Sequence, residues 1–438
     1  MKLFSRSAVL FAAFLIASCE GPAETEFSGN EVTENETSGN NKTKSTQEAA
    51  AEQDAHGFWK SPNETYISTE WAVNDDDLKV WEVPKLEKAF IDTAPAERND
   101  GIVVGELGVD GGDKDMLVKL AEEIADGQHG NIDSLLIAHK GQLLFESYYS
   151  NGRLNLTHPQ ASATKTYTGL ALGRAMQLGY LTMEDLDKPV ISFLDDLDPT
   201  KFVEGAQKVT LHHALTMRTG IRISNEQREE FHNNPDQVEG QKLVQAIFEQ
   251  SAPITEESQS TFAYGNYGTP LVMQVVDAVV PGTAEEFVKN DLLSKLDITT
   301  YRWLSEFGLP AAGWKSSFTS RDMMKFGLLA ANKGKWNDEQ LIPEAYITKA
   351  TSKILSTGDD DIYGGGKDVS DEGYGYYWWS ADLNADDKTY RAPNAQGGGG
   401  QFIILIDELD LVIVSTAGMR DPISLQLAAE RILPAFVQ

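Results

Sequence analysis

The spacing of apolar residues predicts a helix followed by a strand hairpin. From residue 115 to 125, apolar side chains recur at the interval of one helical face, at Met116, Leu117, Leu120, Ala121 and Ile124. Two runs rich in β-formers follow, at 134–138 and 143–148, separated by Lys140 and Gly141. A tight turn between two such runs is typical of a β-hairpin, so a sheet is expected to begin here.

The rest of the chain changes from a helical pattern to a strand pattern. Residues 164–180 read as a long helix ended by Gly179, and most segments from there to about residue 320 look helical or irregular. Strand-like runs return at three places, which are 374–379, 401–406 and 411–415. Residues 424–436 then predict an amphipathic helix. We therefore expect an α/β (α+β) fold with one sheet built from both chain ends and a mostly helical region inserted at about 166–320.

The first residues resemble a bacterial lipoprotein signal. Lys2 and Arg6 precede an apolar run, 8–16, that is too short to span a bilayer, and Ala17-Ser18-Cys19 resembles a lipobox. This pattern predicts a signal peptide over 1–19, lipidation of Cys19 and a location in the bacterial cell envelope, facing the periplasm or the exterior. An ordinary signal peptide that happens to contain a cysteine is the alternative. Cys19 is the only cysteine, which excludes disulfides and cysteine nucleophiles from the rest of the chain.

Composition separates a tether from a globular part. Residues 20–56 are rich in Glu, Asn, Ser and Thr and almost free of large apolar residues, so we expect a flexible acidic tether there and an enzyme-sized globular domain over 57–438. The formal net charge is −30, and most of it belongs to the predicted domain. A surface this acidic repels phosphate backbones and argues against a nucleic-acid partner.

A Ser-x-x-Lys pair, Ser162 and Lys165, is the first candidate for chemistry. It follows the predicted hairpin and opens the predicted helix, where a spacing of three places both side chains on one face. A serine hydroxyl needs a base to become a good nucleophile, and a lysine whose pKa is lowered by burial is suited to that role. The alternative is a helix-capping serine beside a solvated lysine.

Tyr264-Gly265-Asn266 lies about a hundred residues downstream in a polar, glycine-rich stretch. A tyrosine there is suited to carry a proton between Ser162 and a leaving group, and Asn266 to hydrogen-bond Lys165 or a substrate carbonyl. The same pattern at Tyr149-Ser150-Asn151 falls at a strand end before Ser162, so chain position favours the later copy. The alternative for Tyr264 is a satisfied tyrosine in a buried turn.

Gly397 and Gly398 belong to a glycine run that leads directly into the apolar strand at 401–406. Glycine lets a backbone lie very close to a ligand, and the amides of Gly398 and Ser162 are candidates for stabilising an oxyanion. A flexible hairpin turn is the alternative.

Two other clusters suggest structural roles. His212 and His213 are adjacent and point about 100° apart on a helix, which suits packing or capping better than shared metal ligation. The aromatic residues between 374 and 379 are more typical of a strand core than of a sugar-binding platform.

Taken in order, the three motifs resemble those of the class C β-lactamase, DD-peptidase and family VIII esterase group, most closely the aminohexanoate-dimer (nylon-oligomer) hydrolase branch. The resemblance covers about 133–434 and includes the segments 209–220, 313–317 and 322–327. It implies a β-lactamase/transpeptidase-like fold with an antiparallel sheet flanked by helices. It also implies an acyl-enzyme on Ser162, Lys165 and Tyr264 as a general-base pair, Asn266 as a positioning residue, and no metal or organic cofactor.

One departure bears on substrate. Where penicillin-recognising relatives have Lys-Thr-Gly or His-Thr-Gly, this chain has Ala395-Gln396-Gly397, which lacks the cation. The sequence therefore predicts an exported serine hydrolase (a carboxylesterase or an amide hydrolase) acting on a small ester or amide. The alternatives are a β-lactamase or DD-peptidase acting on β-lactams or peptidoglycan peptides, and a catalytically silent binding or sensing module of the envelope.

Overall fold

The computed structural model describes residue 80 and residues 83–358, 361–385 and 387–437. The predicted signal peptide, its Cys19 and the predicted tether over 20–56 lie outside the described residues. Within the described part, none of the helices combines the length and the apolar character needed to cross a membrane.

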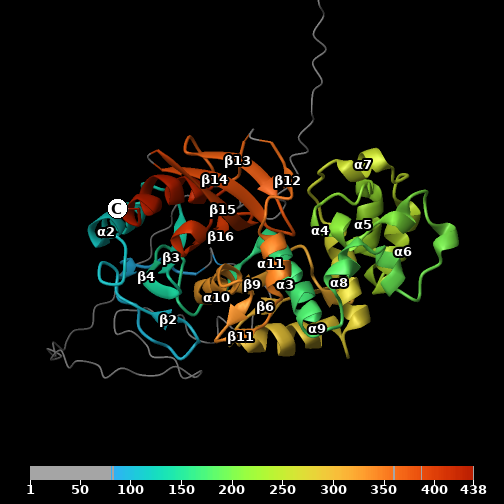
Figure 1. Ribbon diagram of the computed structural model, residues 1–438, viewed down its shortest axis with the longest axis horizontal. Helices are drawn as coiled ribbons and strands as arrows, with labels where there is room; N and C mark the ends of the chain where they lie inside the picture. The colour runs from blue at the N-terminus through green and yellow to red at the C-terminus, as the bar shows by residue number, and fades with distance from the viewer. Residues whose placement is uncertain (1–79, 81–82, 359–360, 386, 438) are drawn as a thin grey trace, which may run out of the picture. The chain divides into compact units, whose positions relative to one another are not determined.

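One large sheet organises the described residues (Figure 1). Its strands run in the order β1-β4-β3-β17-β16-β15-β14-β13-β12, antiparallel throughout, and β2 adds to β4 in parallel. The bounds are β1 Phe90–Asp92, β2 Val103–Val104, β3 Ile132–His139, β4 Gln142–Tyr148, β12 Leu355–Ser356, β13 Val369–Tyr374, β14 Trp379–Ala385, β15 Lys388–Gly397, β16 Gln401–Ile406 and β17 Leu411–Ala417. Because β17 pairs with β3, the two chain ends meet in the middle of the sheet.

The central strands are apolar on both faces because each face is covered. In β3, Leu136 contributes to the core cluster that contains helix α3, whereas Leu135 and Ile137 contribute to the cluster that contains helix α2. Alternate side chains of a strand point to opposite faces, so a strand covered on both sides reads as a continuous apolar run. The runs at 401–406 and 411–415 have this character for the same reason.

Helices cover both faces and fill the region inserted between α3 and α10. Their bounds are α2 Lys114–Ala125, α3 Thr164–Gln177, α4 Leu211–Leu215, α5 Asn225–Asn233, α6 Gln241–Gln250, α7 Glu256–Ser260, α8 Gly268–Val279, α9 Ala284–Phe287, α10 Ser320–Ala331, α11 Glu344–Ala350 and α12 Ser424–Leu427. Figure 1 shows α4 to α8 gathered on one side of the sheet. Helix α3 is buried almost along its whole length, and α11 packs on it closely: a Cβ added at Gly173 would lie 2.8 Å from the ring of Tyr346.

The predicted fold class is confirmed, and three local predictions need correction. The aromatic run 374–379 is not one strand: β13 ends at Tyr374, β14 begins at Trp379, and Tyr377 between them has a φ of 59°, which no strand allows. Strand β15 and most of β14 were not predicted, because they mix polar and small residues. The C-terminal pattern at 424–436 is also broken, since α12 is followed by a π-helical and a 3-10 turn.

Two short strands outside the main sheet support the site. β5, His158–Pro159, precedes α3, and it pairs with β9, Ser316–Phe318, which in turn pairs with β6, Arg302–Trp303. The segment that enters α3 is therefore hydrogen-bonded to the segment that follows Gly313.

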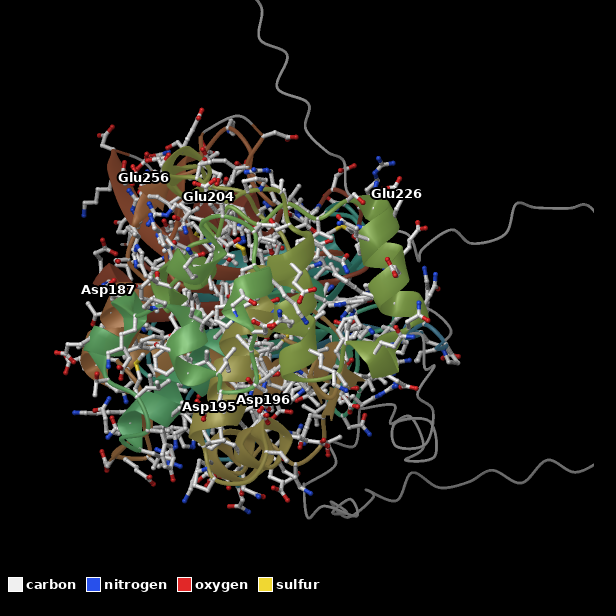
Figure 2. All side chains as sticks on the ribbon, turned by 90° about the vertical axis from the view of Figure 1, so that its right-hand side faces the viewer. Asp187, Asp195, Asp196, Glu204, Glu226 and Glu256 are labelled. Atoms are coloured by element: carbon white, nitrogen blue, oxygen red, sulfur yellow. The ribbon has the colours of Figure 1, made fainter. Side chains whose placement is uncertain are left out.

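The acidity of the chain is displayed on the helical region. Figure 2 shows six carboxylates distributed over the face formed by this region, and all six are exposed, namely Asp187, Asp195, Asp196, Glu204, Glu226 and Glu256. Such a surface disfavours the approach of anions.

Candidate active site

Ser162 lies in the turn that leads into helix α3. It is the middle residue of a 3-10 turn, Ala161–Ala163, and the helix begins at Thr164. Ala161 has a φ of 45°, a left-handed conformation that residues with a side chain rarely adopt. Strained backbone of this kind is often found at functional sites. Ser162 is partly exposed while the helix behind it is buried, so the turn holds the hydroxyl at the edge of the core.

Lys165 lies one helical turn further on, against the serine. Its Nζ is 3.2 Å from Ser162 Oγ and donates to the carbonyl oxygen of Gly313 at 2.9 Å. Lys165 is only 2% exposed. The spacing of three that the sequence shows therefore brings the two side chains into contact, as expected of a helix start.

Burial without a counterion changes the basicity of Lys165. Desolvation lowers the pKa of its ammonium from 10.5 to about 7, because the neutral amine is easier to bury than the charged form. No carboxylate forms an ion pair with Lys165 among the residues that the structure describes. A large fraction of the amine is therefore neutral near pH 7 and able to take a proton from Ser162.

Tyr264 lies in the loop between α7 and α8 and completes the group. Its hydroxyl is hydrogen-bonded to Ser162, and Lys165 Nζ lies 5.0 Å from the centre of its ring. Although the residue is 41% exposed, the protein around its hydroxyl raises the pKa to about 12, and the hydrogen bond from Ser162 only partly offsets this. Tyr264 thus keeps its proton at a pH at which Lys165 has begun to lose one.

The aromatic rings at the end of the sheet hold Tyr264 in place. Trp379, the first residue of β14, lies 5.1 Å from the Tyr264 ring, and Tyr374 meets it edge-on at 6.2 Å. Tyr376, Tyr377 and Trp378 are buried, as expected of core aromatics. Tyr374 and Trp379, the two ends of this run, contact a candidate catalytic side chain, and their sequence context gave no means of recognising these contacts.

Asn266 is exposed beside the same groups. Its Oδ1 would lie 3.0 Å from a Cβ added at Gly313, so Asn266 adjoins the glycine whose carbonyl binds Lys165. Lys165 donates a hydrogen bond to the carbonyl of Gly313, a contact that the sequence alone did not predict. The role of Asn266 toward a substrate stays a prediction.

The glycine run approaches the serine turn from the other side. Gly397 is the last residue of β15, and a Cβ added there would lie 2.1 Å from the carbonyl oxygen of Gln160, so only glycine fits. A Cβ added at Gly398 would lie 3.8 Å from the Cβ of Ala161. Gly398 is exposed and next to the nucleophile turn, which is where a second oxyanion donor is needed.

The position that lacks a cation is fully buried. Ala395 has no exposed surface and packs in the same core as Ala163 and Tyr167. Gln396 beside it is also buried, and its amide donates to the side chain of Asn394 at 2.9 Å. These side chains contribute no positive charge to the site.

An aromatic side chain stands next to the carbonyl that binds Lys165. Trp314 is 42% exposed, and its indole donates to Glu306 at 3.2 Å. Lys315 has a φ of 65° and forms an ion pair with Glu306 at 2.8 Å, so its charge is already compensated. Trp314 thus offers exposed apolar surface beside the site.

The residues given structural roles lie in structural contacts. His213 completes a capping box with Thr210 at the start of α4, and His212 binds the Tyr376 hydroxyl at 2.8 Å. In the early Tyr-Ser-Asn copy, Tyr149 is buried and Asn151 is hydrogen-bonded to Asp133. Neither group meets Ser162.

Comparison with known proteins shows the family and the fold of the chain. The family model for Beta-lactamase matches residues 119–422, which is more than half of the chain. A protein described as a 6-aminohexanoate-dimer hydrolase from Bacillus anthracis superposes with a TM-score of 0.52 at 17% identity, over 77% of this chain and 84% of that one.

Two further solved structures share the fold. A D-stereospecific amidohydrolase from Streptomyces sp. gives a TM-score of 0.52 at 15% identity, and EstCE1, a hydrolase with promiscuous acyltransferase activity, gives 0.54 at 14%; each match covers 72% of this chain and 98% of the other. No curated protein matches the sequence. The family match and the shared fold place the chain in the beta-lactamase family of hydrolases.

Proposed function

We propose that the protein is a serine hydrolase that cleaves uncharged esters or amides through an acyl-enzyme on Ser162. The observation that carries the proposal is the buried Lys165, which has no counterion among the described residues, has its Nζ 3.2 Å from Ser162 Oγ, and has a pKa lowered to about 7. An amine of this basicity beside a hydroxyl is suited to general-base catalysis near neutral pH.

Acylation follows from the positions of these groups. Neutral Lys165 takes the proton of the Ser162 hydroxyl while Oγ attacks the substrate carbonyl carbon. The carbonyl oxygen becomes an oxyanion, to which we assign the backbone amides of Ser162 and Gly398 as donors, because Gly398 lies next to the serine turn. In the glycine turn, the amide of Gly399 donates to the Tyr363 hydroxyl and that of Gly400 donates to the carbonyl of Gly397.

Departure of the leaving group requires a proton, and Tyr264 is placed to supply it. Its high pKa keeps the phenol protonated until the leaving oxygen or nitrogen takes the proton. The ammonium of Lys165, next to the ring, then reprotonates Tyr264. Deacylation repeats these steps in reverse order with water in place of the leaving group, and the acid is released from Ser162.

Charge supports uncharged substrates. No cation stands at Ala395, Lys315 is held by Glu306, and the helical region presents carboxylates to solvent. A substrate carboxylate would find no cation at the position where penicillin-recognising relatives keep one. Exposed Trp314 offers apolar contact to a hydrocarbon or aryl group instead.

Covalent labelling tests the proposal. Incubation with a fluorophosphonate, followed by mass spectrometry of peptides, should give one adduct on Ser162, and Ser162→Ala should abolish it. Ser260→Ala, an exposed serine at the end of α7, is the matched control and should label normally. An unlabelled, correctly folded wild-type protein would favour the silent binding module.

We also propose that Cys19 carries the lipid that holds the protein in the cell envelope, on the strength of the first nineteen residues. Each buried methylene of an acyl chain contributes about 0.8 kcal/mol to membrane binding. Cys19→Ala should release soluble protein or accumulate uncleaved precursor. Unchanged membrane fractionation and lipid labelling of this variant would refute the anchor.

A further inference from the structure

The two expected oxyanion donors are linked by one backbone contact. Gln160 precedes the nucleophile turn and Gly397 precedes the other donor, and their backbones touch with no side chain between them. Any shift of Gln160 therefore moves the amide of Ser162 relative to that of Gly398. Oxyanion stabilisation depends strongly on such distances.

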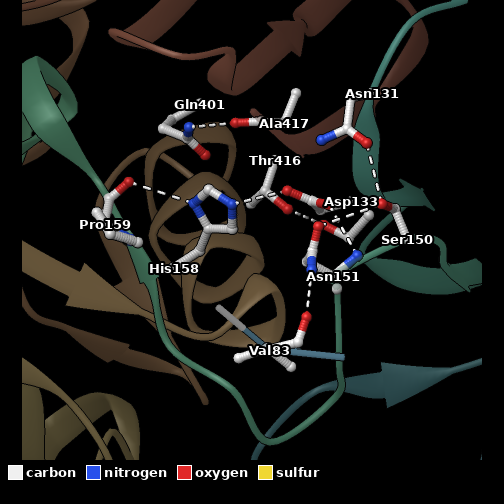
Figure 3. Close-up of polar contacts among 12 residues, drawn as sticks. Val83, Asn131, Asp133, Ser150, Asn151, His158, Pro159, Gln401, Thr416 and Ala417 are labelled. Atoms are coloured by element: carbon white, nitrogen blue, oxygen red, sulfur yellow. Dashed lines mark hydrogen bonds and ion pairs between the residues drawn. The ribbon is translucent and has the colours of Figure 1, made fainter. Parts of the chain in front are cut away.

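A buried contact between a histidine and a carboxylate holds the segment that contains Gln160 (Figure 3). Nε2 of His158, in β5, lies 3.1 Å from Oδ2 of Asp133, in β3. His158 is 8% exposed and Asp133 1%. The other carboxylate oxygen of Asp133 accepts from the backbone amide of Asn151 at 3.1 Å, so both oxygens are used. The pair ties the short strand before Ser162 to the centre of the main sheet.

Gln160 carries this anchoring on toward the nucleophile. Its side chain is fully buried, donates to the backbone oxygen of His158 at 2.8 Å and accepts from the Tyr167 hydroxyl at 2.7 Å. Tyr167 lies on α3, two residues after Lys165. The hydrogen bonds thus run from Asp133 through His158 and Gln160 into the catalytic helix.

The glycine turn is anchored to the same part of the sheet. Gln401, the first residue of β16, is 2% exposed and donates to the backbone oxygen of Ala417 at 2.9 Å, while its Oε1 is buried without a hydrogen-bond partner among the described residues. Ala417 pairs with Ile132, the neighbour of Asp133. Figure 3 shows His158 bonded to Pro159 on one side and to Asp133 on the other. Gln401 and Asp133 are therefore anchored on neighbouring parts of strands β17 and β3.

We infer that His158 and Asp133 are positioning residues that set the spacing of the oxyanion donors at Ser162 and Gly398. The inference rests on the proposed function and assigns a mechanistic role to a pair that touches no substrate. Polar side chains are costly to bury and need a hydrogen-bonded partner to be tolerated. His158 lies two residues before Gln160, whose backbone touches Gly397, and this position gives the pair a role in transition-state binding.

Three variants and one control test this. His158→Ala removes the partner of Asp133, and His158→Gln keeps an amide donor. Asp133→Asn, which is isosteric, leaves one oxygen to serve both His158 and Asn151, and it provides a second measurement if a His158 variant does not fold. The matched control is Glu123→Gln on α2, which removes a carboxylate that His129 contacts at 3.1 Å and that also pairs with Arg431.

The measured quantities separate positioning from a structural role. With p-nitrophenyl butyrate, well below the melting temperature, kcat should fall about tenfold in His158→Gln and about a hundredfold in His158→Ala, with KM within about twofold of the wild-type value. Affinity for phenylboronic acid, which forms a tetrahedral adduct with the serine, should fall by the same factor as kcat/KM. Glu123→Gln should leave both unchanged.

Two results would overturn the inference. One is a folded His158→Ala or Asp133→Asn protein with wild-type kcat and wild-type boronate affinity. The other is a loss of kcat that appears only as melting is approached, which would give the pair a purely structural role. An inactive wild-type protein without a Ser162 adduct would instead remove the proposed function itself, so the two failures are distinguishable.

Discussion

Helices α3 and α10 each bury a lysine, and they treat its charge in opposite ways. Lys165 on α3 and Lys325 on α10 are both 2% exposed. Lys325 forms an ion pair with Asp322 at 3.0 Å and donates to the carbonyl of Asp297 at 2.8 Å. Lys165 has a carbonyl and a serine hydroxyl as partners, and no carboxylate among the described residues.

Helix α10 also buries a second cation, Arg321, whose charge is compensated. The guanidinium of Arg321 binds both oxygens of Glu146 and reaches Asp100 at 2.9 Å, deep in the protein. Arg321 on helix α10 thereby joins the segment that contains Asp100 to strand β4, which contains Glu146. A buried charge with partners holds a structure together, whereas a buried amine without one changes its basicity and becomes available for chemistry.

The largest expected effect is loss of hydrolysis on changing the uncompensated site. Ser162→Ala and Lys165→Met should each lower kcat at least about a thousandfold, because the nucleophile or its base is missing. Lys165→Met should fold normally and unfold no more easily than the wild type, since it removes a buried charge that had no counterion. Steady-state kinetics and urea unfolding measure the two effects. Wild-type turnover by folded Ser162→Ala would make the nucleophile assignment wrong.

For the buried lysine of α10 we expect the opposite: stability is lost and activity is kept. Lys325→Met leaves Asp322 buried without its cation and should destabilise the fold by about 3–5 kcal/mol. The folded fraction should hydrolyse esters at close to the wild-type kcat, because Lys325 does not touch the site. Urea unfolding together with active-site titration checks this. If Lys325→Met left stability unchanged and Lys165→Met lowered it, the comparison between the two helices would fail.

The missing cation at Ala395 extends the comparison to substrates. A charge-assisted hydrogen bond to a carboxylate contributes about 1.5–3 kcal/mol, or roughly ten- to a hundredfold in kcat/KM. Uncharged esters need no such contact, so p-nitrophenyl butyrate should be cleaved with a higher kcat/KM than nitrocefin. Both assays are run on one preparation. Faster nitrocefin turnover would restore the β-lactamase alternative.

The smallest expected effect is the pH profile. The pKa of Lys165 is about 7, and the neutral amine is the active form. Ester kcat/KM should therefore rise about tenfold between pH 6 and pH 8 and then level off. A flat profile over this range would show that an amine of this pKa is not the base.

Stability should follow pH with the same sign. The folded pKa of Lys165 lies below its unfolded value of 10.5, so the unfolded chain binds more protons between about pH 7 and pH 10.5. The contribution of Lys165 to stability is complete above that window and decreases as pH falls through it. The difference in unfolding free energy between the wild type and Lys165→Met should shrink as pH rises from 7 to 10. A difference that did not vary with pH would contradict the lowered pKa.

The sequence by itself determined the local features of this protein. The helix that begins at Thr164, the hairpin at 134–148 and the strands at 401–406 and 411–415 follow from the spacing of apolar residues, because covered faces demand it. The contact between Ser162 and Lys165 follows from a spacing of three on a helix. The absence of a cation at position 395 is also evident from the sequence, because the residue there is alanine.

Only the tertiary structure decided the long-range contacts and their energies. Gly313, whose carbonyl binds Lys165, lies 148 residues away from it in the sequence. Trp379 and Tyr264, whose rings are in contact, are also far apart in the sequence. The pKa of Lys165 depends on which groups surround it, and Lys325 would read as an equally plausible base without the ion pair to Asp322. Local pattern fixes which side chains share a face, whereas desolvation and charge compensation are set by segments that meet only in the folded chain.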